Sequence, residues 1–144
     1  MADNTKPTRP VFTNIHVTDI VHYKLPPAGI VSILHRISGV VMFLLLPFVV
    51  WMFDTSLTSE ISYDEFKSVF TAGAGILPAI VVNVITWGLI WAYLHHFIAG
   101  VRHLLMDTNH HLVSKQTGHN SALATLVLSV GLTLILGAKL FGFF

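Results

Sequence analysis

The sequence predicts an all-α integral membrane protein with three transmembrane helices. Of its 144 residues, 53% are hydrophobic and only 10% are charged, whereas a water-soluble domain carries about a quarter charged residues. The apolar residues fall into three runs, each long enough to cross a hydrocarbon core of about 30 Å as a helix that rises about 1.5 Å per residue. Because lipid cannot pair free backbone groups, runs of this length and continuity must be helices.

The first predicted helix covers about residues 28–53, after a polar segment at 1–27. The pair Pro26-Pro27 ends this segment, and two prolines stop a preceding helix while suiting the first turn of the next one. The later part of the run is purely apolar. Its first third carries four polar side chains: Ser32, His35, Arg36 and Ser38.

The second and third predicted helices cover about 77–105 and 122–144. A polar loop at 54–67 and a glycine-rich connector precede the second helix, and a histidine-rich polar loop at 107–120 precedes the third. Lys139 is the one charge of the third run, and its long side chain can extend to the nearby interface. Three helices make a thin bundle whose polar positions need partners, so we expect a second membrane subunit.

Composition narrows the class of protein further. The chain has no cysteine, which excludes disulfides, thiolate metal sites and iron–sulfur ligation by this chain. A net charge of +1 without a basic patch gives no indication of nucleic-acid binding. Residues 1–19 resemble neither a secretory nor a mitochondrial targeting segment. We therefore expect a single membrane-anchor domain, 1–144, in a bacterial inner (plasma) membrane.

Basic residues predict the orientation of the chain, because cytoplasmic segments carry an excess of Lys and Arg. Six lie on the side of the N-terminus and the second loop: Lys6, Arg9, Lys24, Arg36, Arg102 and Lys115. Two lie on the other side: Lys67 and Lys139. The N-terminus and the second loop are therefore expected to face the cytoplasm, and the C-terminus the outside.

Histidines in the second helix are candidates for a functional site, because ionisable side chains within a membrane span are costly. At about 100° per residue, His96, Gly100 and His103 share one stripe, whereas His95 points elsewhere with Arg102. A neutral imidazole can ligate haem iron, and a glycine one turn away leaves room for a porphyrin. Arg102 and His103 lie nearer the cytoplasm, where propionates need positive donors. The alternative is a structural or proton-relay histidine.

Ser32, His35 and Arg36 share one face of the first helix, at spacings i, i+3 and i+4. A hydroxyl and a guanidinium can donate hydrogen bonds to a quinone carbonyl or a propionate. For Arg36 alone, the alternative is a side chain extended to the interface. The predicted topology puts this cluster at the same membrane end as His103, which favours a site. Three further histidines lie in the predicted second loop: His110, His111 and His119. They are better explained as solvated side chains than as a weak metal site.

The order and spacing of these residues resemble the cytochrome b anchor subunit of succinate dehydrogenase. Three motifs carry the resemblance: Arg9-Pro10-Val11, Ser32-Ile-Leu-His35-Arg36-Ile-Ser38-Gly39 and His96-Phe-Ile-Ala-Gly100-Val-Arg102-His103-Leu-Leu-Met-Asp107. The last motif is the most specific, because a His followed at this spacing by Gly-x-Arg-His-x-x-x-Asp is rarely met by chance. The resemblance thins over the third predicted helix.

The resemblance implies a four-subunit succinate:quinone oxidoreductase in which this subunit alone is not catalytic. A flavoprotein subunit oxidises succinate, an iron–sulfur subunit relays electrons, and two anchor subunits in the lipid bilayer bind haem b and reduce ubiquinone. His96 would be the axial ligand of the haem iron, with the second ligand from the smaller anchor. His35, Arg36 and His103 would lie near the propionates, and Ser32 with Arg36 would help to form the quinone site.

Two alternatives stay open. A dihaem cytochrome b would need more histidines at helical depth, so one strong axial histidine suits a single haem shared with the second anchor better. The other alternative is a haem-free structural anchor of a related quinone-linked fumarate reductase or another membrane oxidoreductase. A haem b absorption band in the purified membrane protein would separate the haem-binding from the haem-free hypothesis.

Overall fold

The computed structural model describes residues 16–142, without the side chains of Val17, Ile20, Val21, His110 and His111. Outside this range lie Lys6, the Arg9-Pro10-Val11 motif, and Phe143 and Phe144 of the third predicted helix. The helices of the described part are α1 (Val17–His22), α2 (Pro27–Thr58), α3 (Glu60–Ala72), α4 (Ala79–Thr108), the 3₁₀ helix η1 (His110–Val113) and α5 (Lys115–Leu140). The predicted all-α class is confirmed.

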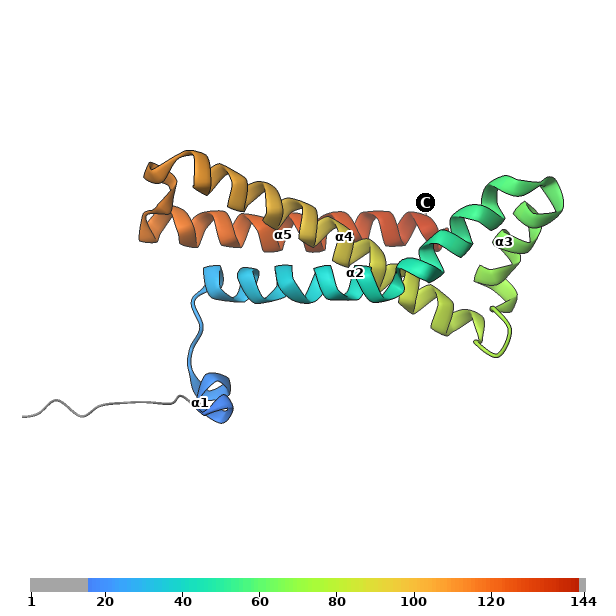
Figure 1. Ribbon diagram of the computed structural model, residues 1–144, viewed down its shortest axis with the longest axis horizontal. Coiled ribbons are helices and arrows are strands. Elements are labelled where there is room, and N and C mark those ends of the chain that lie inside the picture. Colours follow the sequence, from blue (N-terminus) through green and yellow to red (C-terminus); the bar gives the residue numbers. More distant parts are fainter. Residues whose placement is uncertain (1–15, 143–144) are drawn as a thin grey trace, which may run out of the picture.

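The three long helices, α2, α4 and α5, form one bundle in which each contacts the other two (Figure 1). The start of α2, the end of α4 and the start of α5 lie together at one end of the bundle. At the other end α3 packs against α2 and α4, and α1 lies apart from the bundle. All three long helices are long and apolar enough to cross a membrane, which confirms the predicted three-helix architecture.

The outer surface of the bundle is apolar. In the most hydrophobic 18-residue windows of α2, α4 and α5, only 6%, 17% and 28% of residues are buried within the chain. Large side chains such as Phe43, Leu104 and Val127 are exposed along the bundle. A surface this apolar is stable against lipid or another membrane protein but not against water. The chain is therefore a multi-pass membrane protein.

α2 starts where the two prolines predict. Pro26 is extended, with φ −65° and ψ 153°, and Pro27 occupies the first helical position, where its missing N–H costs nothing. The helix then continues through Pro47 to Thr58, beyond the predicted end at 53. An interior proline removes one backbone hydrogen bond and bends a helix, and α2 changes direction in its second half (Figure 1).

The polar segment between α2 and α4 is mostly helical, so the predicted loop at 54–67 is wrong. Ser59 and Ser62 cap α3 reciprocally: each backbone N–H donates to the other side chain's Oγ, over 2.8 Å from Ser59 and 3.1 Å from Ser62. Val69 is buried with apolar residues of α2 and α4. α3 was not predicted from the sequence, because most of its residues are polar and only one face of the helix is apolar.

α5 begins earlier than predicted, at Lys115 rather than at about 122. Ser114 starts it, because its Oγ accepts a 3.2 Å hydrogen bond from the Thr117 backbone N–H. His119, expected in the loop, therefore lies on the helix and is exposed. The interior face of α5 is a line of small residues packed toward the other helices: Gly118, Ala122, Thr125, Ser129, Thr133 and Gly137.

Candidate functional site

The contact between α2 and α4 brings three of the candidate histidines together. The rings of His35 on α2 and His96 on α4 stack, with centroids 4.1 Å apart and planes inclined by 19°. The ring of His103, about two turns further along α4, has its centroid 5.2 Å from that of His35. The two helix faces singled out in the sequence therefore meet in one cluster.

The hydrogen bonds of His96 determine where its ring proton lies. Its Nδ1 is 3.0 Å from the backbone carbonyl oxygen of His35 and 3.3 Å from Oγ of Ser38. A carbonyl oxygen can only accept, so Nδ1 must carry the proton and donate it. The other nitrogen, Nε2, then holds a free electron pair, which is the form in which a neutral histidine binds a metal.

Two glycines lie beside the histidine rings, and the one at Gly39 makes room for His96. A Cβ added at Gly39 would lie 3.0 Å from Cε1 of His96, so only glycine accommodates the ring there without a shift. A Cβ at Gly100 would lie 3.6 Å from Nε2 of His35. The space beside Gly100, expected for a porphyrin, is occupied in this structure by the His35 ring.

Ser38 and Gly39 were not among the predicted site residues, although both stand in the motif of the first helix. Ser38 has no exposed surface, and Gly39 faces the His96 ring. The spacing offered a signal, because a serine three residues after His35 can donate to the His35 carbonyl. Which residue of the other helix would meet this pair depends on how the two helices pack, and sequence spacing does not give that.

Ser32 and Arg36 lie one turn apart on the same part of α2 as His35. Ser32 is half-buried and Arg36 is exposed. Among residues 16–142, no carboxylate pairs with Arg36; the ion pair found there joins Lys67 to Asp64, 2.9 Å apart, at the α3 end. A hydroxyl and an unpaired guanidinium therefore lie beside the histidine cluster, both open to a partner or ligand.

His95 lies about 100° around α4 from His96, on the side that contacts Ser129 of α5. The side chain is fully buried, its Nδ1 is 3.2 Å from Oγ of Ser129, and its ring stacks on Trp91 with centroids 5.3 Å apart. This placement agrees with the stripe predicted for His96, which excludes His95. The two adjacent histidines therefore belong to different helix contacts.

Arg102 was expected to reach the haem propionates, and the structure places it elsewhere. Its guanidinium is buried against α5, donating to Oγ of Ser121 over 2.9 Å and to the carbonyl of Gly118 over 3.3 Å. Arg102 thus shares the side of His95, as its position in the helical repeat requires. Of the Arg102-His103 pair, only His103 faces the cluster.

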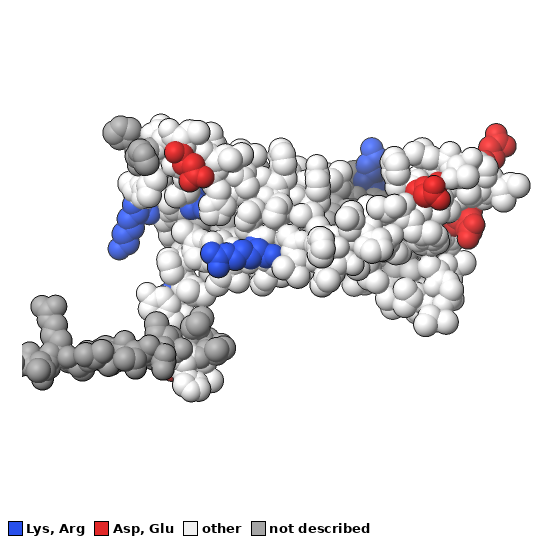
Figure 2. Space-filling view, in the orientation of Figure 1, with Lys and Arg blue, Asp and Glu red and all other residues white. Residues whose placement is uncertain are grey.

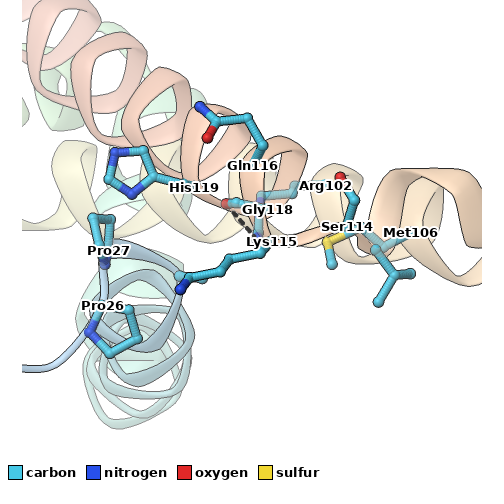
Figure 3. Close-up of a pocket in the computed structure, with 11 residues that line it drawn as sticks. Pro26, Pro27, Arg102, Met106, Ser114, Lys115, Gln116, Gly118 and His119 are labelled. Atoms are coloured by element: carbon cyan, nitrogen blue, oxygen red, sulfur yellow. Dashed lines mark hydrogen bonds between the residues drawn. The ribbon is translucent and has the colours of Figure 1, made fainter.

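A separate cavity of about 740 Å³ lies at the end of the bundle away from α3, between the start of α2, the end of α4 and the start of α5 (Figure 3). Pro26 and Pro27 form one wall. The basic side chains that line it are Arg102, Lys115 and His119. Neither His35 nor His96 lines this cavity, so it is distinct from the histidine cluster.

Comparison with known proteins identifies the family of the chain. Residues 6–136 match the family of succinate dehydrogenase/fumarate reductase transmembrane subunits. The chain belongs to this family. By its name, a subunit of this family is part of a succinate dehydrogenase or fumarate reductase complex. The resemblance drawn from the sequence motifs is therefore confirmed.

Two relatives carry the same name, succinate dehydrogenase cytochrome b556 subunit. The protein of Paracoccus denitrificans is 29% identical to this transmembrane subunit over 135 residues, which cover 94% of each chain. The protein of Coxiella burnetii is 34% identical over 89 residues, which cover 62% of this chain and 66% of the relative. The similarity to the Paracoccus protein extends over nearly the whole chain, the third long helix included.

Proposed function

We propose that this transmembrane subunit is the larger cytochrome b anchor of a succinate dehydrogenase. It would bind one haem b, shared with a smaller anchor subunit, and help to form the site where ubiquinone is reduced. Electrons taken from succinate in a flavoprotein subunit would reach this site through an iron–sulfur subunit. The family of the chain, the cytochrome b556 names of both relatives and the surroundings of His96 support the proposal.

The 3.0 Å contact between Nδ1 of His96 and the His35 carbonyl oxygen is the observation that carries the haem proposal. With Nδ1–H held by the His35 carbonyl, Nε2 is free to act as the axial ligand. Among the described side chains, no group of three His, Cys, Asp or Glu could hold a bare metal ion. A metal at His96 would have to bring most of its ligands with it, as porphyrin iron does. The second axial ligand would come from the smaller anchor.

His35, Arg36 and His103 are the proposed partners of the haem propionates. The two rings are close to His96, and Arg36 lacks a carboxylate partner among the described residues. A guanidinium forms its strongest hydrogen bonds with carboxylates. Bound haem would supply one-electron redox chemistry; these side chains would hold its carboxylates at the end of the bundle where α2 begins.

Ser32 and Arg36 are the proposed quinone contacts. A quinone presents two carbonyl oxygens that only accept hydrogen bonds, and both side chains are donors. They lie one turn apart, and Arg36 is exposed on α2. Arg36 is long enough to serve the quinone on one side and the propionates on the other, which is why it appears in both proposed sets.

A haem-free structural anchor of a related fumarate reductase or other membrane oxidoreductase is the competing function. A reduced-minus-oxidised spectrum of the protein purified from membranes, with the masses of co-purifying subunits, separates the two. Our proposal predicts a haem b band, about one haem per copy, and three further subunits. A preparation that retains its subunits and quinone activity but lacks the band would contradict the haem proposal and favour the competing one.

We further propose that the protein lies in a bacterial inner membrane with its N-terminus in the cytoplasm. The charges of the two bundle ends support this orientation. Most acidic side chains in view lie at the α3 end, with one at the other end, and Lys and Arg lie mainly toward that other end (Figure 2). The acidic residues of the α3 end are Asp54, Glu60, Asp64 and Glu65. Because positive charge favours the cytoplasmic side, the end with the histidine cluster would face inward.

A further inference from the structure

Ser38 is the one buried hydroxyl in the histidine cluster. It lies on α2 between the histidine that stacks on His96 and the glycine that makes room for it, and it has no exposed surface. Its Oγ is 2.8 Å from the His35 carbonyl oxygen and 3.3 Å from Nδ1 of His96. The hydroxyl thus contacts both members of the hydrogen bond that fixes the His96 ring.

Counting protons gives the direction of each of these hydrogen bonds. The His35 carbonyl can only accept, so Ser38 donates its single hydroxyl proton there. The lone pairs of the same oxygen are then left to accept from Nδ1–H of His96. The imidazole proton is therefore shared between two acceptors, a carbonyl and a hydroxyl, and the hydroxyl is itself oriented by that carbonyl.

From this arrangement we propose that Ser38 is a positioning residue for His96, which holds the proton on Nδ1 and raises the electron-donating strength of Nε2 toward haem iron. The inference rests on the proposed haem ligation by His96. Acceptors on the far nitrogen of a metal-bound histidine fix its ring and make it a stronger ligand. Because Ser38 itself has no exposed surface, bulk water does not reach its hydroxyl to replace it.

The alternative is that Ser38 is simply a small side chain that lets α2 approach α4. The chain contains a matched control for that reading. Ser129 is equally buried, and its Oγ is 3.2 Å from Nδ1 of His95, the neighbouring histidine that faces α5. Loss of either hydroxyl removes a buried contact between a serine Oγ and a histidine Nδ1 on a neighbouring helix. Only the loss at Ser38 would reach a metal ligand.

The test compares Ser38→Ala, Ser38→Cys and Ser129→Ala in the complex purified from membranes. Bound haem per subunit and the midpoint potential of the haem are measured for each. Removing an acceptor makes His96 a weaker donor, which favours ferrous over ferric iron. We expect Ser38→Ala to raise the potential and to weaken haem retention on the order of tenfold. Ser38→Cys, with a weak acceptor of similar shape, should fall between Ser38→Ala and the unchanged protein.

Ser129→Ala should leave both quantities unchanged. An unchanged potential in Ser38→Ala, or the same shift in Ser129→Ala, overturns the inference. If Ser38→Ala does not assemble, the potential of Ser38→Cys alone decides, and no shift there overturns it. His96→Ala, measured in parallel, keeps the two proposals apart. Haem retained in that variant refutes the ligation itself, whereas its loss, with a normal Ser38→Ala, refutes only the role of Ser38.

Discussion

At the scale of single residues, two adjacent histidines show what sequence periodicity can predict. His95 and His96 differ by about 100° around α4, so the sequence predicts that they point in different directions. In the structure the first contacts a serine of α5 and the second contacts a backbone carbonyl of α2. The same argument groups Arg102 with His95, which is where it lies, so the expectation that Arg102 reaches the propionates was inconsistent with the helical repeat. The roles of Ser38 and Gly39 could not be predicted, because their contacts with His96 depend on the packing of two helices.

The proposed quinone contacts make a residue-scale prediction. Ser32→Ala and Arg36→Leu should lower quinone reduction while leaving succinate oxidation by a soluble dye largely intact, because the proposed complex assigns the flavin chemistry to another subunit. A lost hydrogen bond costs about 1–3 kcal/mol, with the charged group toward the upper end. Parallel assays with dye and quinone measure the split. Equal losses in both assays would mean that the residues act through assembly, contrary to the proposal.

At the scale of helices, long apolar runs were predictable and short polar helices were not. Each of α2, α4 and α5 follows from a run long enough to cross lipid, and the prolines before α2 define its start. α3 was missed, because its stability comes from the Ser59–Ser62 capping box and from Val69 packed on its neighbours. The two serines of the capping box can be found in the sequence, but the residues of α2 and α4 on which Val69 packs cannot, so the helix was not predicted.

The contact between α4 and α5 supports a second prediction, at Gly137. The indole Nε1–H of Trp87 donates to the Thr133 carbonyl over 3.1 Å, and its ring lies where a Cβ of Gly137 would be. Gly137→Ala should therefore separate the helices and cost about 1–3 kcal/mol as overpacking. Thermal unfolding in detergent, followed by circular dichroism, measures this cost.

Gly131→Ala is the control for that experiment, because an added Cβ at Gly131 meets no atom within 4 Å. Both substitutions gain the same helix propensity, about 0.5–1 kcal/mol, so their difference reports the clash alone. Gly131→Ala should melt at or above the temperature of the unchanged protein, and Gly137→Ala below it. Equal melting temperatures would show that Trp87 does not require the glycine.

At the scale of the whole molecule, the bundle cannot be complete by itself. Its three helices bury few of their own apolar residues, and the polar cluster of α2 and α4 is only partly covered. Lipid can cover the apolar faces, but Arg36 and the histidines require hydrogen-bonding partners. The proposed second anchor subunit, beside α2 and α4, would satisfy that need. The sequence predicts such a partner but not its contact surface.

Membrane orientation is testable on this scale, because the chain has no cysteine of its own. Gln116→Cys and Thr58→Cys place single exposed thiols at opposite ends of the bundle. An impermeant maleimide should label the first only from the cytoplasmic side and the second only from the outside of sealed vesicles. The reverse pattern would put the proposed quinone contacts on the face away from the proposed iron–sulfur subunit, and would contradict the proposed orientation.

The central claim is that His96, and not His95, ligates haem iron. Haem content of His96→Ala and His95→Ala, each in the purified complex, tests it most directly, and a pyridine haemochrome assay measures it. His96→Ala should lose most of its haem. His95→Ala should keep it, because His95 contacts Ser129 and Trp91 within the helix packing. Equal haem in the two variants, or loss from His95→Ala alone, would contradict the account.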